Sequence, residues 1–235
     1  MMNKPLEIIY QDEYLVAINK PHGLLVHRSP IAADASEFAI QLLRDQLGMK
    51  VYPVHRLDRK TSGVLLFALN EDINRMMQEA FMNKQVKKKY LALLRGYTSA
   101  SGVIDYALTN EKGKIQEAIT NFATLKSFEL PISFGNQETS RYSLVEVWPE
   151  TGRMHQIRKH FAHIFHPIIG DRPHGCNKQN KLFLEQWNMN TMLLHAQQIE
   201  FIHPLSLELI KINGEIHDDF KRILSLFDNH TVRKV

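Results

Sequence analysis

The feature that most constrains the fold is a continuous apolar run that directly follows a charged loop. Residues 64–69 (Val-Leu-Leu-Phe-Ala-Leu) contain no polar side chain, and a short run of this kind is typical of a strand covered on both faces. Residues 61–63 (Thr-Ser-Gly) predict a turn that leads into this strand. Asp58 lies just before the turn, between Arg56 and Arg59. A carboxylate at the entrance to a buried strand is therefore a candidate functional residue.

A loop aspartate also has a simpler interpretation, in which it accepts hydrogen bonds from backbone N–H groups and pairs with a neighbouring arginine. The surrounding residues favour a functional role. Residues 55–64 read His-Arg-Leu-Asp-Arg-Lys-Thr-Ser-Gly-Val. This segment resembles the signature of the RluA-type pseudouridine synthases, in which His-Arg-Leu-Asp-Arg is followed by any residue and Thr-Ser-Gly. Every fixed position of that signature is matched.

Further segments resemble the same family and occur in its order. Residues 20–24 match the Lys-Pro, any residue, Gly pattern, and residues 89–92 and 151–160 match two later blocks. From about Leu6 to Phe227 the chain is most similar to family members that modify uridine 65 of tRNA. That likeness rests on residues 12–17, 25–29, 54–69, 166–171 and 193–196. Cys176 departs from the pattern, and two loops, residues 110–140 and 176–190, are short.

The hydrophobic pattern predicts an α+β fold. Residues 6–10 and 14–18 are expected to form paired strands, and residues 90–94, 118–128 and 141–147 further strands. Helices are expected at 38–47, ending at Gly48, at 70–81, at 154–163 and near the C-terminus. Apolar residues recur at helical spacing in the second and last helices: Ile73, Met76, Met77, Ala80 and Phe81, and Phe220, Ile223, Leu224 and Phe227.

The resulting architecture is a mixed, mainly antiparallel sheet with flanking helices, to which the resemblance adds a central catalytic cleft. No linker or repeat divides residues 1–235, so we expect a single catalytic domain. The first family block begins at residue 20, and for this reason we expect no separate N-terminal RNA-binding domain.

Charge and composition narrow the possible partners. The net charge is +4, the pI is about 9.1, and basic residues cluster at 84–89 and 153–160, which suits a polyanion, although either cluster can also be an ordinary solvated face. Cys176 is the only cysteine, and no apolar stretch approaches the roughly 18 residues of a membrane span. We therefore expect a cytoplasmic protein that does not bind a membrane, with no obligatory protein partner.

The resemblance implies the isomerisation of uridine to pseudouridine, which needs no cofactor. It makes Asp58 the catalytic residue, pairs Arg158 with it, and stacks the Tyr90 ring on the extruded base. Arg56 points to the same side as Asp58 if the segment is extended, and in relatives the matching arginine contacts RNA. The remaining expected RNA-binding residues are Arg153, His155 and Lys159, with Arg59 and Lys20 as weaker candidates.

Several alternatives stay open. The histidines at 155, 160, 163 and 166 do not have the spacing of a helical metal site, so no metal is expected. The predicted substrate is tRNA, but a ribosomal RNA pseudouridine synthase would have the same catalytic residues. A noncatalytic RNA-binding module or chaperone would keep the basic clusters without needing Asp58 and Arg158. A glycoside hydrolase would need a second acid near Asp58, and no matched block supplies one.

Overall fold

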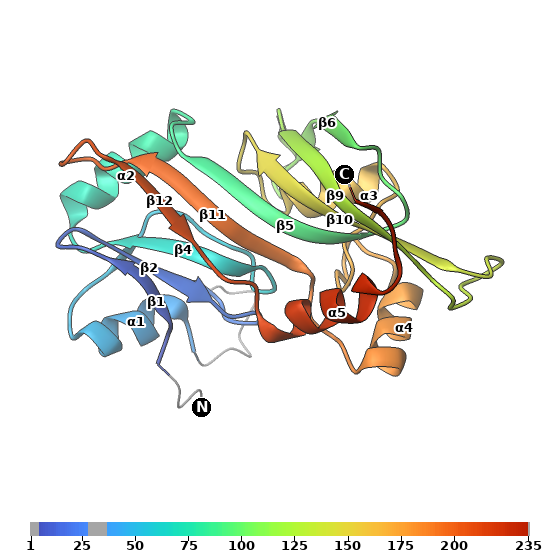
Figure 1. Cartoon of the computed structure of the whole chain (residues 1–235). Helices are drawn as coiled ribbons and strands as arrows, with labels where there is room; N and C mark the ends of the chain where they lie inside the picture. Colours follow the sequence, from blue (N-terminus) through green and yellow to red (C-terminus); the bar gives the residue numbers. More distant parts are fainter. Residues whose placement is uncertain (1–4, 28–36, 235) are drawn as a thin grey trace. The chain divides into compact units, whose positions relative to one another are not determined.

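The structure is a computed structural model that describes residues 5–27 and 37–234. The described part alternates strands with five helices and is of the α+β class, as the sequence predicted. It divides into two compact units, Met1–Lys88 with Ala196–Ile216 and Lys89–His195 with His217–Val235. Figure 1 shows the chain in sequence colours. Arg28 and Ser29, which contribute to the closer likeness, lie outside the described residues.

The first unit contains the predicted apolar strand. All seven residues of β4 (Ser62–Ala68) are buried, and β4 pairs antiparallel with β2 (Leu15–Lys20), so that Lys20 lies opposite Gly63. The two predicted N-terminal strands are present as β1 (Ile8–Gln11) and β2, which also pair antiparallel. The remaining strands of this unit are β3 (Tyr52–Pro53), paired with β4, and β12 (Leu209–Asn213), paired with β11 (Leu194–Ile202).

Both predicted helices of the first unit form. The first is α1 (Ala39–Leu47), which ends at Gly48 with φ +68°, a left-handed conformation that glycine adopts without strain. The second is α2 (Glu71–Met82), and the side chain of Asn70 caps it by accepting the N–H of Ile73. The apolar stripe of α2 is narrower than predicted, because Met77 is 1% exposed whereas Met76 is 40% exposed.

The second unit is built on long antiparallel strands. Its strand order is β5-β10-β9-β13, and β6 also pairs with β9. A small antiparallel hairpin of β7 and β8 precedes β9. The bounds of these strands are β5 (Lys87–Arg95), β6 (Ser101–Asp105), β7 (Leu108–Thr109), β8 (Ile115–Gln116), β9 (Ile119–Leu130), β10 (Ser140–Pro149) and β13 (Thr231–Lys234).

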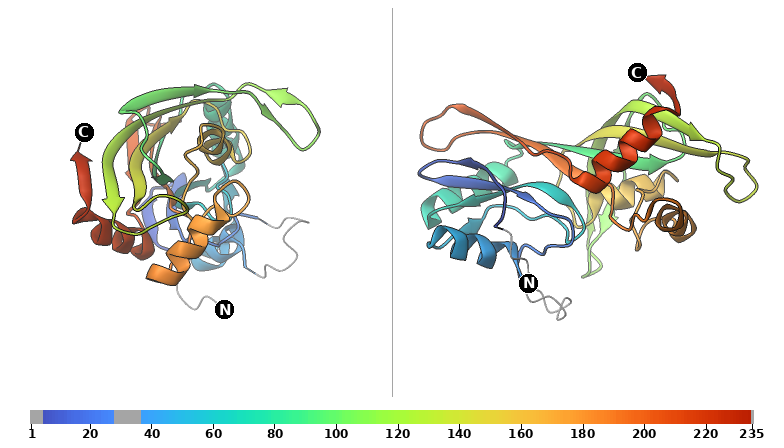
Figure 2. Two further views of the ribbon diagram at one scale, coloured as in Figure 1. Left: turned by 90° about the vertical axis from the view of Figure 1, so that its right-hand side faces the viewer. Right: turned by 60° about the horizontal axis from the view of Figure 1, so that its bottom comes forward.

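Three helices complete the second unit. The predicted helix near residue 154 is α3 (Gln156–His163), which buries Phe161 against Phe122. The predicted C-terminal helix is α5 (Asp218–Asp228), which packs on β9 (Figure 2). Its Phe227 is buried against Phe128 of β9. The third helix, α4 (Asn177–Trp187), was not predicted. No helix in the described ranges has the length and apolar character that crossing a bilayer requires.

Candidate functional site

Asp58 lies in the loop between β3 and β4 of the first unit and is half-buried. The backbone N–H of Thr61 donates to the carbonyl of Asp58 at 3.1 Å, which closes the predicted turn. Gly63 has a φ of +107°, and its backbone lies close to the backbone of Ala196. A Cβ atom at this position would lie 2.2 Å from the carbonyl oxygen of Ala196. The Thr-Ser-Gly part of the signature thus has a structural reason, since only glycine fits here.

Lys20 lies beneath this loop and is wholly buried. Its Nζ donates to the carbonyl oxygens of Leu24 at 2.8 Å, Pro21 at 3.0 Å and Arg59 at 3.2 Å. Burial lowers the pKa of Lys20 to about 7, and the charge of Asp58 opposes this shift. The predicted phosphate contact does not fit such burial. Through these hydrogen bonds Lys20 instead connects the Lys-Pro turn to the loop that carries Asp58.

The two arginines that flank Asp58 differ in their surroundings. Arg59 forms a reciprocal contact with Gly23, because its Nε donates to the carbonyl of Gly23 at 3.1 Å and its own carbonyl accepts the N–H of Gly23 at 2.9 Å. Both side chains are exposed. The hydrogen bond to Gly23 ties Arg59 to the Lys-Pro turn, and both arginines present charge to the solvent.

His55, the first residue of the signature, was not predicted as a site residue. Its Nε2 accepts the backbone N–H of Leu66 at 3.1 Å, and its ring stacks on Phe81 with centroids 5.0 Å apart. Burial, with a contribution from the charge of Lys88, lowers the pKa of His55 to about 4. The imidazole is consequently neutral near pH 7 and fixes the start of the loop to β4.

Tyr90 belongs to the second unit and lies on β5, directly opposite Val147 of β10. It is half-buried and packs beside a core cluster that includes Ala92 and Leu94. The basic run before it is partly neutralised, because the Nζ of Lys89 lies 2.9 Å from the carboxylate of Glu146. This run is thus less available to RNA than the sequence suggested.

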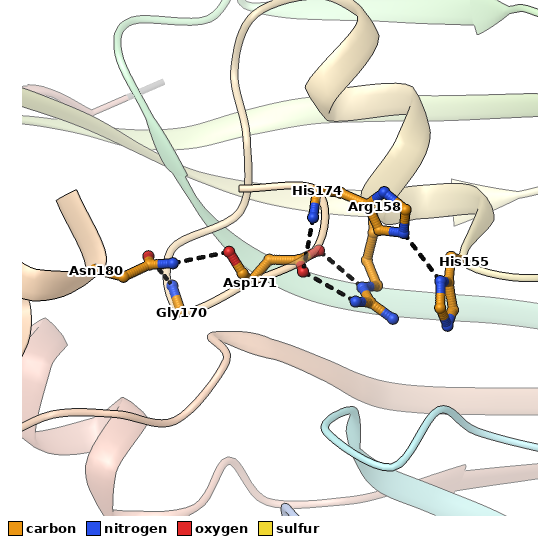
Figure 3. Close-up of polar contacts among 6 residues, drawn as sticks. All are labelled: His155, Arg158, Gly170, Asp171, His174 and Asn180. Carbon is orange, nitrogen blue, oxygen red and sulfur yellow. Dashed lines mark hydrogen bonds and ion pairs between the residues drawn. The ribbon is translucent and has the colours of Figure 1, made fainter. Parts of the chain in front are cut away.

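Arg158 projects from α3 into a buried ion pair with Asp171 (Figure 3). Its Nε donates to Oδ2 of Asp171 at 2.7 Å and its Nη2 to Oδ1 at 2.9 Å. The side chains are 5% and 1% exposed. Burial favours a raised pKa for Asp171, but the hydrogen bonds and charge of Arg158 outweigh it and hold the pKa below its usual value. Asp171 lies in residues 166–171, one of the segments that resemble the family, but no feature of the sequence links it to Arg158.

Asp171 is itself held by neighbouring backbone and side chains. Its Oδ1 accepts the backbone N–H of His174 at 3.3 Å, and its carbonyl accepts the side-chain amide of Asn180 at 2.7 Å. The Oδ1 of Asn180 in turn accepts the N–H of Gly170 at 2.8 Å. Figure 3 shows these contacts converging on one short turn.

The start of α3 carries the other predicted RNA-binding residues. His155 precedes the helix with φ 57°, and its Nδ1 lies 2.9 Å from Nε2 of His174 (Figure 3). The Nε of Arg153 donates to the carbonyl of Glu117 at 3.0 Å. Arg153 and Lys159 are both half-buried. Lys159 belongs to α3, whereas Arg153 and His155 precede the helix. Their contacts with RNA stay a prediction.

The structure thus gathers the predicted residues into two groups, one in each unit. Asp58, Arg56, Arg59 and Lys20 belong to the first unit, and Tyr90, Arg153, His155, Arg158 and Lys159 to the second. The pairing of Asp58 with Arg158 joins the two groups and stays a prediction. Among the residues that the structure describes, no cluster of three or more histidine, cysteine or acidic side chains could hold a metal ion.

Comparison with known proteins identifies the class that this fold and these motifs define. Residues 14–163 match the family model described as RNA pseudouridylate synthase. The chain belongs to this family, and the resemblance to the RluA-type pseudouridine synthases is confirmed.

The chain is 44% identical to tRNA pseudouridine synthase C of Vibrio parahaemolyticus, over 95% of each protein. It is also 44% identical to tRNA pseudouridine synthase C of Haemophilus influenzae, over 94% of this chain and 98% of that relative. Among solved structures, human RNA pseudouridylate synthase domain containing 4 superposes with a TM-score of 0.71 at 28% identity, covering 93% of this chain and 92% of the human one.

Proposed function

We propose that this chain isomerises a uridine of tRNA to pseudouridine, with Asp58 as the catalytic residue. The observation that carries the proposal is the 44% identity to relatives named tRNA pseudouridine synthase C, which extends over 95% of this chain. Identity of this extent includes the segments outside the shared signature, and these are the segments in which family members with different substrates are expected to differ. A cytoplasmic location follows from a tRNA substrate.

The reaction balances without any added group. The bond between C1′ of the ribose and N1 of uracil breaks, the base turns, and a bond forms between C1′ and C5. The hydrogen of C5 leaves as a proton, and N1 gains one. A carboxylate can serve either as a nucleophile toward an electrophilic carbon or as a base toward a sugar proton. Asp58 is suited to both roles, since it is half-buried on a loop that internal hydrogen bonds hold in place.

Arg158 and Tyr90 complete the proposed catalytic set. A guanidinium can donate two hydrogen bonds to one carboxylate, so Arg158 would pair with Asp58 and hold its carboxylate in place. The Tyr90 ring would stack on the extruded uracil, a contact worth about 1–3 kcal/mol that offsets the cost of unstacking the base. In this proposal residues 1–235 serve as a single catalytic domain.

The RNA itself would be held through its phosphates. Arg56, Arg153 and Lys159 supply charges, and His155 stands at the N-terminal end of α3, where backbone N–H groups favour an anion. The target uridine is proposed to be position 65, in the acceptor and T-stem region. A ribosomal RNA substrate would be handled by the same catalytic residues, so only mapping of the product separates the two substrates.

The test is release of tritium from tRNA transcripts that carry the label at uracil C5, followed by mapping of the modified position. Wild-type protein should release tritium from one uridine of tRNA. Asp58→Asn, which is nearly isosteric, should release none while binding tRNA with similar affinity, because phosphate contacts dominate binding.

Asp45→Asn is a matched control, since Asp45 lies in the same unit and pairs with Arg44 at an exposed site. It should be as active as wild type. Wild-type turnover by Asp58→Asn would refute the proposed catalytic role. No release from tRNA together with release from ribosomal RNA would move the substrate to the ribosome, and no release from either would favour a noncatalytic RNA-binding module.

A further inference from the structure

The carboxylate of Asp171 is held by three hydrogen bonds. Its two oxygens engage two nitrogens of Arg158, and one of them also accepts the N–H of His174. The flanking glycines bring the backbone close on both sides. A Cβ at Gly170 would lie 1.9 Å from the carbonyl oxygen of Thr191, and one at Gly175 would lie 2.0 Å from that of Asp171. The turn can therefore shift very little.

A contribution to stability does not account for this arrangement. Removing two charges from water is expensive, and a buried ion pair is often no more stabilising than apolar residues of the same volume. Elsewhere on α3, Ile157 and Phe161 lie in the apolar core, and the buried polar side chains of Gln156 and His160 contact neighbouring oxygen atoms. Arg158 differs from these residues because it forms a buried ion pair, in which both side chains are almost fully enclosed.

The two parallel hydrogen bonds between Arg158 and Asp171, here called the fork, restrict the orientation of the Arg158 side chain. The guanidinium group is planar, and Asp171 takes the edge formed by Nε and Nη2. This contact fixes both the plane and the direction of the group. The opposite edge, which carries Nη1, must then face away from Asp171 (Figure 3). Small rotations of Arg158 that would be possible on an unsupported side chain are excluded.

We infer that Asp171 is a positioning residue for the isomerisation, which sets the orientation in which Arg158 presents its Nη1 edge to the reacting carboxylate. The inference rests on the proposed function, in which Arg158 pairs with Asp58. Asp171 itself touches neither the substrate nor the reacting atoms. Asp171 affects the reaction only through the orientation of the Arg158 guanidinium.

The turn that carries Asp171 also contacts the N-terminal end of α3, where RNA-binding residues are predicted. The backbone N–H of His174 donates to Asp171, and the ring of His174 contacts His155. His155 directly precedes α3, two residues before Ile157 and three before Arg158. A single turn thus supports both Arg158 and a residue expected to meet phosphate.

The experiment measures single-turnover formation of pseudouridine with the full chain and unmodified tRNA labelled at uracil C5. Asp171→Asn keeps the size of the side chain but removes its charge and one acceptor. Its rate constant should fall about 100-fold, the loss typical of a displacement near 1 Å at a reacting group. The reaction amplitude and the tRNA affinity should stay within twofold of wild type. A merely structural role would lower the amplitude, through loss of folded protein, and leave the rate constant unchanged.

Two comparisons make the result specific. Asp228→Asn is the matched control, because Asp228 lies in the same unit and pairs with Lys126 at an exposed site, and it should react at the wild-type rate. In an Arg158→Lys background, which cannot form the fork, Asp171→Asn should reduce the rate constant much less than it does in wild type. If the two changes instead reduce the rate constant independently, so that their effects multiply, the inference is overturned. A wild-type rate constant for Asp171→Asn would also overturn it.

If Asp171→Asn fails to fold, Asp171→Glu replaces it, since this change keeps the charge but displaces it by one methylene. The same loss in rate constant would support positioning, and a wild-type rate constant would overturn it. Failure of the proposed function appears separately, as a wild-type protein that forms no pseudouridine in tRNA. The series would then be repeated on ribosomal RNA.

Discussion

The imidazole of His55 accepts the backbone N–H of Leu66 at 3.1 Å, which joins the first residue of the signature to the centre of β4. The contact requires Nε2 to be unprotonated. Because burial and the charge of Lys88 lower the pKa of His55 to about 4, the folded protein resists protonation of this ring well below neutral pH. The loop that carries Asp58 therefore depends on a neutral histidine.

This dependence predicts a stability change in acid. The ordinary pKa of 6.5 applies to His55 in the unfolded chain, so between pH 6.5 and 4 the unfolded chain binds a proton that the folded chain does not. Stability should thus fall as the pH is lowered through this window, by up to about 1.4 kcal/mol per pH unit from this residue. The measurement is the free energy of unfolding at pH 7 and pH 4, from urea titrations of wild type and His55→Asn.

His55→Asn should be less stable than wild type at pH 7 but should lose about 2–3 kcal/mol less on acidification. His27→Asn provides the control, since His27 is exposed, and its acid sensitivity should equal that of wild type. An equal loss in wild type and His55→Asn would show that His55 does not titrate as described.

The buried ammonium of Lys20 predicts a second effect on stability. Lys20→Met has nearly the same length but supplies no donor to the three carbonyl oxygens that Nζ now contacts. Leaving buried acceptors without a donor should reduce the free energy of unfolding by about 1–3 kcal/mol. Lys50→Met is the control, because Lys50 pairs with Glu71 at an exposed site. Equal stabilities of the two variants would contradict the role assigned to Lys20.

Gly63 offers a test of the turn that leads into β4. Gly63→Ala would place a methyl group 2.2 Å from the carbonyl of Ala196 at a φ of +107°. Overpacking and backbone strain should together lower the free energy of unfolding by about 3 kcal/mol. Gly48→Ala serves for comparison, since Gly48 also has positive φ but nothing within 4 Å, and should cost only about 1 kcal/mol. Thermal or urea unfolding of both variants distinguishes a steric cost from a purely conformational one.

The elements that could be predicted from the sequence are those with local signals. The stripe of α2 and the capping residue Asn70 marked that helix, and the apolar run marked β4. The helix α4 was missed because its buried residues, Gln179 and Phe183, include a polar side chain that bonds to Tyr142. Periodicity of apolar residues cannot reveal a helix whose inner face is partly polar.

The candidate site shows the same limit. Asp58, Tyr90 and Arg158 could be named from short motifs, because each motif is contiguous in the chain. The contact between Arg158 and Asp171 spans 13 residues and depends on how α3 and the following turn fold back. The burial of Lys20 likewise depends on the approach of the Arg59 loop, 39 residues away. Such contacts have no local signal in a single sequence.

The basic residues around α3 predict how tRNA binding responds to salt. Neutralising phosphates releases condensed counterions, so the logarithm of the association constant should fall linearly with the logarithm of the salt concentration. Lys159→Gln removes one positive charge from α3 and should reduce the slope by roughly 0.7–0.9 while weakening binding to all tRNA sequences alike. The measurement is filter binding across a series of KCl concentrations. Lys126→Gln, which removes a charge already paired with Asp228, should leave the slope unchanged. A slope that is the same in wild type and Lys159→Gln would exclude a phosphate contact at Lys159.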